Sequence, residues 1–195
     1  MKKSILAASL FIVILSTLGL AGPNWDSKGA IYVLPHTPRT CSEDFPIVTD
    51  CDDIITTQPG SDVDVFPVFY DLDEYREFTY AISWVPLDVI GCPFTGCSDY
   101  TSITTLWPGE SVTQTWNDCL PGPMVVTGWF HLQGDWGYIY FTGPAYVVDC
   151  DGLAEGVCGC HAGGFGGEIG DDPCEPCCPS GAESGTWGDI KAMFR

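Results

Sequence analysis

Apolar and polar side chains alternate without interruption over residues 77–85 of this chain. One side of that pattern carries the large apolar residues Phe78, Tyr80, Ile82 and Trp84. A period of two residues predicts a β-strand with one face in the core and the other toward water. We therefore expect these four side chains to be buried.

Residues 65–70, just before this strand, are apolar on both sides. Such a run predicts a strand that lies between two layers. Residues 71–76 are charged and short enough for a turn. We therefore expect residues 65–70 and 77–85 to pair as the hairpin at the centre of the fold.

A second hairpin is predicted around Gly134 and Asp135, which fit a two-residue turn between two alternating stretches. The turn would place residues 129–132 opposite residues 137–140. One face of this hairpin would carry Phe130, Leu132, Ile139 and Phe141. The other face would carry Trp129, His131, Tyr138 and Tyr140.

Shorter strands are predicted at residues 30–34, 110–117 and 146–149, with Gly- and Pro-rich turns between them. Residues 54–55 allow a further short strand. No helical period of useful length occurs before the last ten residues. The chain is therefore predicted to be all-β, an antiparallel β-sandwich of the Ig-like or jelly-roll-like kind.

The first residues of the chain predict export. Lys2 and Lys3 precede an apolar run at residues 5–15, and small residues lead to a cleavage point after Ala21. This is the pattern of a secretory signal peptide over residues 1–21, and the apolar run is short for a membrane span. The mature chain would lack a transmembrane segment, and its sandwich domain would cover residues 22–149 outside the cytoplasm.

Eleven cysteines in an exported chain predict disulfides. Six of them lie in residues 150–179, which are rich in glycine and poor in apolar bulk, so we expect an irregular, disulfide-tied wrap along the sandwich. Sequence alone leaves the pairing open. Near neighbours suggest Cys41 with Cys51 and Cys92 with Cys97. The odd number leaves one cysteine free, paired between chains or bound to a ligand.

Residues 186–195 follow a flexible linker at residues 180–185 and predict a short amphipathic helix. Its apolar face would carry Trp187, Ile190 and Phe194. Because ten residues do not hold a helix alone in water, we expect a docking or sorting partner to receive that face. The segment resembles the TWGxIKxxxR-type endings of exported proteins from uncultivated bacterial lineages. The matching residues are Thr186, Trp187, Gly188, Ile190, Lys191 and Arg195.

The strand order over residues 63–149 resembles a cohesin-like sandwich of the carbohydrate-binding superfamily. In such domains a VxVPVxx strand leads into an alternating strand that ends in an aromatic residue, as residues 63–84 do here. Cohesins are not cysteine-rich, so the cysteine-rich segment departs from that pattern. The resemblance implies a binding or structural role at the cell surface, without catalysis.

The charge of the chain narrows the choice of partner. A formal net charge of −19 would repel nucleic acid and anionic membranes, so surface proteins or polysaccharide are the expected partners. Carboxylates also suit Ca²⁺. The clustered acids are Asp62, Asp64, Asp71, Asp73, Glu74, Asp149 and Asp151. They match no EF-hand loop, so we expect no cofactor, with Ca²⁺ as the alternative.

Candidate metal or catalytic chemistry is sparse. Cys158 and Cys160 have one residue between them, whereas a c-type haem site needs two. Zinc bound by these residues, His161 and the cysteines of residues 174–178 is the alternative, but export favours disulfides and leaves His161 as a solvated loop residue. The three histidines of the chain belong to no hydrolase motif, so an enzyme is not expected.

Three functions are considered from these features. The first is a non-catalytic structural or adhesive component of the cell surface or extracellular space. The second is a carbohydrate-binding module that uses the flat aromatic face of Trp129, His131, Tyr138 and Tyr140. That face has another interpretation, in which it is the sandwich interior and the cysteine-rich segment covers the opposite one. A secreted hydrolase is a third function, and it would need two carboxylates with opposed pKa values in a cleft.

Overall fold

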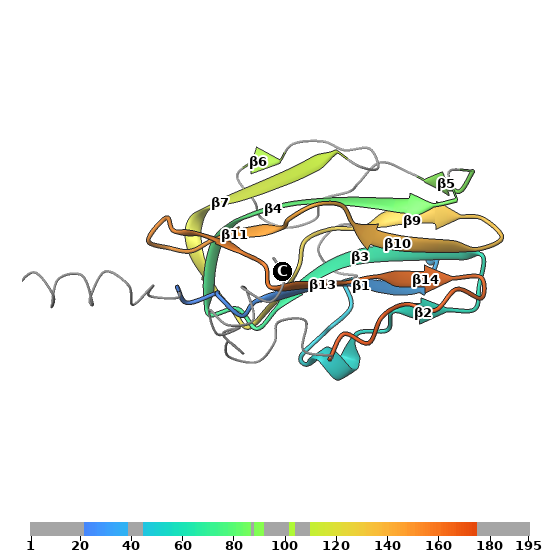
Figure 1. Cartoon of the computed structure of the whole chain (residues 1–195), viewed down its shortest axis with the longest axis horizontal. Helices are drawn as coiled ribbons and strands as arrows, with labels where there is room; N and C mark the ends of the chain where they lie inside the picture. Colours follow the sequence, from blue (N-terminus) through green and yellow to red (C-terminus); the bar gives the residue numbers. More distant parts are fainter. Residues whose placement is uncertain (1–21, 39–44, 87, 92–101, 104–109, 175–195) are drawn as a thin grey trace, which may run out of the picture.

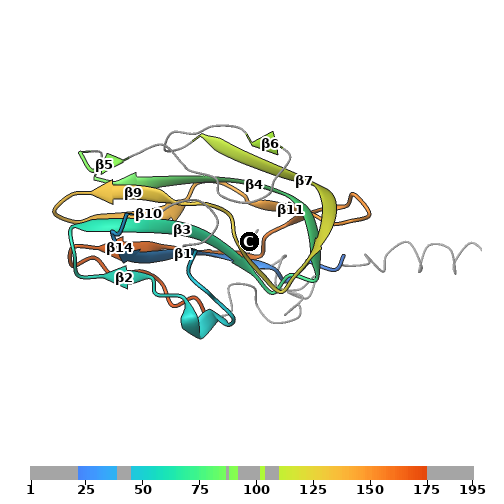
Figure 2. The same cartoon turned by 180° about the vertical axis from the view of Figure 1, so that it is seen from behind.

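Two β-sheets that pack face to face make up the structure (Figures 1 and 2). The computed structural model describes residues 22–38, 45–86, 88–91, 102–103 and 110–174. The first sheet has the order β13 (Gly159–His161), β1 (Lys28–Pro35), β3 (Asp62–Tyr70), β9 (Phe130–Gln133) and β5 (Ile90–Gly91), and β8 (Met124–Val126) also pairs with β3. The second sheet has the order β12 (Ala154–Gly156), β11 (Tyr146–Val148), β4 (Glu74–Val85), β10 (Gly137–Phe141), β14 (Gly163–Phe165) and β2 (Thr57–Gln58). In addition, β7 (Ser111–Pro121) pairs with β4, β6 (Ser102–Ile103) pairs with β7, and a 3₁₀ turn, η1 (Cys51–Asp53), precedes β2.

This arrangement confirms the predicted all-β sandwich. Most strand pairs are antiparallel, but β13 lies parallel to β1 and β14 lies parallel to β2, so both sheets are mixed. Both of these parallel partners come from the cysteine-rich segment, which also supplies β12. The segment therefore does run along the sandwich, and residues 154–165 add strands to both sheets. Within the described ranges, no helix is long and apolar enough to cross a membrane.

Strand β4 shows the alternation that its sequence predicts. Its inward side chains, Phe78, Tyr80, Ile82 and Trp84, are no more than 5 % exposed. Strand β3 is buried on both faces from its second residue onward, as the apolar run also predicts. Its inward residues join the core between the sheets, and its outward residues form a second cluster on the far side.

The predicted hairpin of residues 65–70 with residues 77–85 is wrong. Strand β3 pairs with β1, β8 and β9 in the first sheet, whereas β4 pairs with β7, β10 and β11 in the second. The intervening turn therefore carries the chain across the sandwich, and its Asp71 adopts a positive φ of 57°. Two strands with apolar inner faces can bury those faces either as neighbours in one sheet or as members of two sheets that face each other across the core. The pattern alone could not distinguish these two arrangements.

The second predicted hairpin is wrong for the same reason. Strand β9 pairs with β3 and β5, and β10 pairs with β4 and β14, so the chain crosses between sheets at Gly134 and Asp135. Phe130, Leu132 and Ile139 point into the core. The interpretation of the Trp129 face as the sandwich interior is therefore also wrong.

Two disulfides join distant parts of the described chain, Cys51 with Cys174 and Cys119 with Cys150. The predicted pairing of Cys41 with Cys51 is wrong, because the fold brings a cysteine 123 residues away against the 3₁₀ turn. The predicted pair Cys92–Cys97 lies outside the described residues.

His161 also differs from its prediction. It belongs to β13 rather than to a solvated loop, and its side chain is only 4 % exposed. Strand β13 lies beside β1, with His161 paired to Ala30. The short glycine-rich sequence carries no sign that His161 lies buried on an edge strand.

Candidate functional site

The four aromatic residues that we expected on one face lie on two sheets. Trp129 and His131 face outward from the first sheet, where Trp129 packs against the outer apolar cluster. Tyr138 and Tyr140 belong to β10 of the second sheet, and their rings stack with centroids 6.1 Å apart and an interplanar angle of 27°. Burial, and then the nearby carboxylate of Asp171, raise the pKa of Tyr138. Of the predicted aromatic face, only the tyrosine pair stays together.

His131 belongs instead to a cluster that sequence analysis missed. Its ring stacks on that of His36, with centroids 3.8 Å apart and an interplanar angle of 19°. His131 Nε2 lies 2.6 Å from Asp62 Oδ1, and His36 Nδ1 lies 2.8 Å from Asp64 Oδ1. Asp64 is fully buried, and it also accepts a hydrogen bond from the backbone N–H of Thr37. Two acids spaced by two residues on one strand were the available signal, because both point to the same face.

This cluster joins three strand ends at one end of the first sheet. His36 follows β1, the two aspartates belong to β3, and His131 belongs to β9. A histidine bonded to a carboxylate forms part of a hydrolytic triad, but a triad also needs a nucleophile bonded to the ring. In the described part of the chain, neither imidazole bonds to a serine, threonine or cysteine side chain. The two histidine–aspartate contacts join the end of β1, the start of β3 and β9.

Other acids that could bind Ca²⁺ also have structural partners. Asp71 forms an ion pair with Lys28 at 2.7 Å. Asp149 is 2 % exposed and accepts a hydrogen bond from the backbone N–H of Leu153 at 2.7 Å, which closes the turn between β11 and β12. These carboxylates hold turns and strand ends in place.

Two groups of cysteines and acids come close enough to suggest metal ligands, but both are built around disulfides. One group is Cys51, Asp52 and Cys174, and the other is Glu74, Cys119 and Cys150. Zinc binds thiolate, and a disulfide sulfur carries no such charge. Cys158 is disulfide-bonded as well, so the zinc alternative loses two of its ligands.

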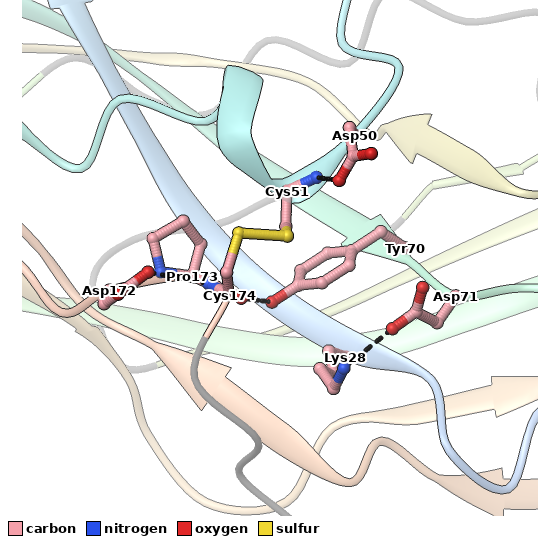
Figure 3. A network of polar contacts seen from close by, with 8 residues as sticks. All are labelled: Lys28, Asp50, Cys51, Tyr70, Asp71, Asp172, Pro173 and Cys174. Carbon is pink, nitrogen blue, oxygen red and sulfur yellow. Dashed lines mark hydrogen bonds and ion pairs between the residues drawn. A yellow bond between two sulfur atoms is a disulfide. The ribbon is translucent and has the colours of Figure 1, made fainter.

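The Cys51–Cys174 disulfide lies at the centre of a polar network on the outer side of the first sheet (Figure 3). The hydroxyl of Tyr70 donates a hydrogen bond to the carbonyl of Pro173 beside it. The ammonium of Lys28 lies 5.7 Å from the centroid of the Tyr70 ring and pairs with Asp71. The network thus fixes the last described residues onto the sheet.

The proposed docking residues Trp187, Ile190 and Phe194 lie outside the described residues. Their role as a receiving or sorting surface therefore stays a prediction from their spacing.

No family model matches the chain, and no curated protein matches its sequence. Among solved structures, its backbone is similar to cohesin modules, the family that the strand order over residues 63–149 resembles.

The cohesin module of a family 33 glycoside hydrolase from Clostridium perfringens is 12 % identical, with a TM-score of 0.44 over 71 % of this chain and 93 % of that one. A non-cellulosomal cohesin from Archaeoglobus fulgidus is 13 % identical, with a TM-score of 0.46 over 72 % and 89 %. The sixth cohesin of scaffoldin B from Acetivibrio cellulolyticus, solved in complex with a Cel5 dockerin, is 10 % identical, with a TM-score of 0.49 over 73 % and 99 %. These similarities concern the course of the backbone alone.

Proposed function

We propose that the protein is a non-catalytic β-sandwich, exported from the cytoplasm, that serves as a structural or adhesive component of the cell surface or extracellular space. The observation that carries this proposal is the pair of disulfides, Cys51–Cys174 and Cys119–Cys150. Disulfides persist in oxidising compartments and are rare in the cytosol. They agree with the signal-peptide pattern of residues 1–21.

The positions of the titratable side chains support a non-catalytic role. The imidazoles of His36 and His131 form hydrogen bonds with Asp64 and Asp62, and these bonds join strand ends. Glu155 accepts a hydrogen bond from the backbone N–H of Asn24 at 2.8 Å and so fixes the start of the described chain. Catalytic groups, in contrast, gather in a cleft where they can reach a substrate.

The charge of the chain supports a protein or polysaccharide partner. At a net charge of −19, the surface attracts basic molecules, does not repel neutral polysaccharides, and repels nucleic acid. The apolar face of Trp187, Ile190 and Phe194 provides a second contact in this proposal, as the docking or sorting segment.

Fractionation of the producing cells tests the proposal. We expect the mature chain, beginning at Gly22, in the surface or medium fraction. Cys51 and Cys174 should resist an alkylating reagent until a reductant is added. An intact chain with residues 1–21 in the cytoplasm, with alkylated cysteines, would contradict both export and the structural role of the disulfides.

Removal of residues 186–195 tests the docking segment separately. We expect the sandwich to keep its thermal midpoint while the protein moves from the cell surface to the medium. An unchanged distribution would rule out a sorting role, and a lower midpoint would mean that the segment packs on its own domain.

Carbohydrate binding is the second candidate function, and the stacked pair of Tyr138 and Tyr140 favours it. Two neighbouring aromatic rings, both only partly buried, offer apolar area to a sugar ring. A glycan array decides: binding should be lost in the Tyr138→Ala/Tyr140→Ala variant and kept in Trp129→Ala, which alters the other sheet. An array without any signal leaves the structural or adhesive role.

A further inference from the structure

A hollow of about 300 Å³ lies at the end of the sandwich where β4 ends and β10 begins. Its lining includes Asp88, Val89, Ile90, Gly134, Asp135 and Trp136. They come from the turn that follows β4 and from the crossover between β9 and β10. The volume is at the lower limit for ligand pockets, which suits a single side chain or sugar ring.

Large apolar side chains gather around this hollow. Ile90 is 70 % exposed and Trp136 is 41 % exposed, although both are residues that a folded chain commonly buries. Val85, at the end of β4 beside the hollow, is 38 % exposed. Exposed apolar side chains gathered at a concave site indicate an interaction surface.

Close backbone contacts hold the two turns of the hollow in place. The N–H of Gly134 donates to the carbonyl of Ser61 at 2.9 Å, and a Cβ at Gly134 would lie 3.0 Å from Val89 Cγ2. On the other side, Gly166 has a positive φ of 67°, and its Cα lies so close to the Asp135 carbonyl that a side chain would not fit. The crossover at Gly134 and Asp135 is therefore held in place on its own domain, which lowers the entropic cost of binding there.

The hollow is negatively charged. Asp88 and Asp135 contribute two carboxylates, and the described residues of the lining include no lysine or arginine. The face of an indole ring also attracts a cation, and Trp136 belongs to the same lining. Lysine and arginine combine an apolar stem with a cationic head, so the stem matches the apolar rim and the head matches the carboxylates.

We infer that this hollow binds a lysine or arginine side chain of a partner protein. The inference rests on the proposed adhesive function and specifies the chemistry of the partner. A neutral sugar would stack on Trp136 but would leave both carboxylate charges uncompensated. Ca²⁺ would use the carboxylates but not the apolar rim. A basic side chain uses both features.

An NMR titration of the oxidised mature protein tests the inference with three blocked tripeptides, Gly-Arg-Gly, Gly-Lys-Gly and Gly-Gln-Gly. The basic peptides should shift the Trp136 indole N–H and the amides of Gly134 and Asp135 in a saturable manner. Raising the salt to about 0.5 M should weaken this binding, because salt screens exposed charges. The glutamine peptide should leave these signals unshifted.

Variants at the two ends of the sandwich provide matched comparisons. Trp136→Ala should weaken binding of the arginine peptide about tenfold, as for a buried aromatic contact, and Asp88→Asn/Asp135→Asn should weaken it several-fold. Trp25→Ala and Asp151→Asn remove an exposed tryptophan and an exposed acid at the opposite end, and they should bind like the parent. Dispersed spectra show that each variant is folded.

Several results would overturn the inference. They are equal shifts with the glutamine peptide, shifts that appear elsewhere, and unchanged affinity in Trp136→Ala. Maltotriose or CaCl₂ that moves the Trp136 signal when the basic peptides do not would assign the hollow to that ligand class instead. Location and disulfide state are measured by cell fractionation, so failure here is distinct from failure of the proposed function.

Discussion

The outer face of the first sheet over residues 66–70 of β3 is apolar and covered, whereas the outer face of the second sheet, along β4, carries small or polar side chains that stay partly exposed. Outward from β3 point Phe66, Val68 and Tyr70, none more than 2 % exposed. Phe45, Val48 and Ile54, from the segment before β2, pack on them. Outward from β4 point Glu77, Thr79, Ala81 and Ser83.

This difference shows that an apolar strand requires a cover on each side, and that the cover must be fastened. The segment over residues 45–54 has little regular structure of its own, so its packing alone would not fix its position. Cys51–Cys174 and the hydrogen bond from Tyr70 to Pro173 attach it and the end of the described chain to the sheet. On the second sheet, cross-strand contacts such as Thr79 with Thr113 at 3.0 Å suffice.

Removing the Cys51–Cys174 cross-link should have the largest effect on the covered face of the first sheet. The Cys51→Ala/Cys174→Ala variant should lose about 4–5 kcal/mol in the free energy of unfolding, because the disulfide closes a long loop in the unfolded chain. It should also bind a hydrophobic dye, since the outer cluster loses its cover. Urea unfolding and dye fluorescence measure the two effects.

The control for this variant is Cys119→Ala/Cys150→Ala. Its cysteines are 31 residues apart, so the loss should be smaller, about 3–4 kcal/mol, and no dye should bind. Dye binding by both variants, or by neither, would mean that the first disulfide does not hold the cover.

Truncating a covered side chain should give the next largest effect. Phe66→Ala removes a fully buried ring and should cost about 3–5 kcal/mol. Thr79→Ala, on the outer face of the second sheet, should cost about 0.5–1 kcal/mol, the worth of one cross-strand contact. Urea unfolding of the two variants checks the difference, and equal losses would show that the face of β3 is not covered.

Disrupting the polar network between the sheets should lower the free energy of unfolding by a smaller amount. Tyr80 Oη lies 2.7 Å from Thr127 Oγ1 and 3.2 Å from Gln114 Oε1, and Gln114 Nε2 donates to the Thr127 carbonyl at 2.7 Å. Tyr80→Phe removes the hydroxyl and should lower the free energy of unfolding by about 1–2 kcal/mol at neutral pH. The outer faces of both sheets should stay unchanged in this variant. Urea unfolding at pH 7 measures this loss.

Alkaline pH provides the matching test at Tyr80. Burial raises the pKa of Tyr80 far above its ordinary value, so the folded state keeps the phenol neutral. The stability that this provides is complete below about pH 10, where an unfolded tyrosine ionises, and it falls as the pH rises further. Tyr80→Phe should therefore lose less stability above pH 10 than the parent does. An equal decline in both proteins would contradict the buried position of the hydroxyl.

The smallest effect should come from the hydrogen bonds to Asp53, in the segment over residues 45–54 that covers the first sheet. Hydrogen bonds from the Thr49 hydroxyl and backbone, with a further one from Asp50, lower the pKa of Asp53. The ionised form thus favours the folded segment above the ordinary value of 3.8, and this contribution is lost as the pH falls through the lowered pKa. Thr49→Val should move the Asp53 titration, followed by carboxyl NMR, to higher pH. Thr113→Val, on the other sheet, should leave that titration unchanged.

Burial was predictable from the sequence because it depends on a local period. The alternation of residues 77–85 and the continuous apolar run of residues 65–70 identified the covered sides of β4 and β3 correctly. Strand pairing was not predictable, because it depends on contacts between distant residues. Tyr138, for example, pairs with Val85 rather than with the residue across Gly134.

The same limit applies to the candidate site. The partner of Cys51 lies 123 residues away, and no spacing in the sequence indicates it. The stack of His36 on His131 depends on the order of β1, β3 and β9, and only the spacing of the two aspartates hinted at a shared face. Because the aromatic face was derived from a hairpin that does not form, its four members could not stay together.

Peptide mapping of the non-reduced protein by mass spectrometry tests the account most directly, because Cys51–Cys174 is the disulfide that, among the described residues, fastens the cover on the first sheet. The structure predicts a peptide pair that joins Cys51 to Cys174. A peptide pair that joins Cys51 to Cys41 would contradict the fastening of the cover by Cys174. An unlinked Cys51 would contradict the oxidised, extracellular role as well.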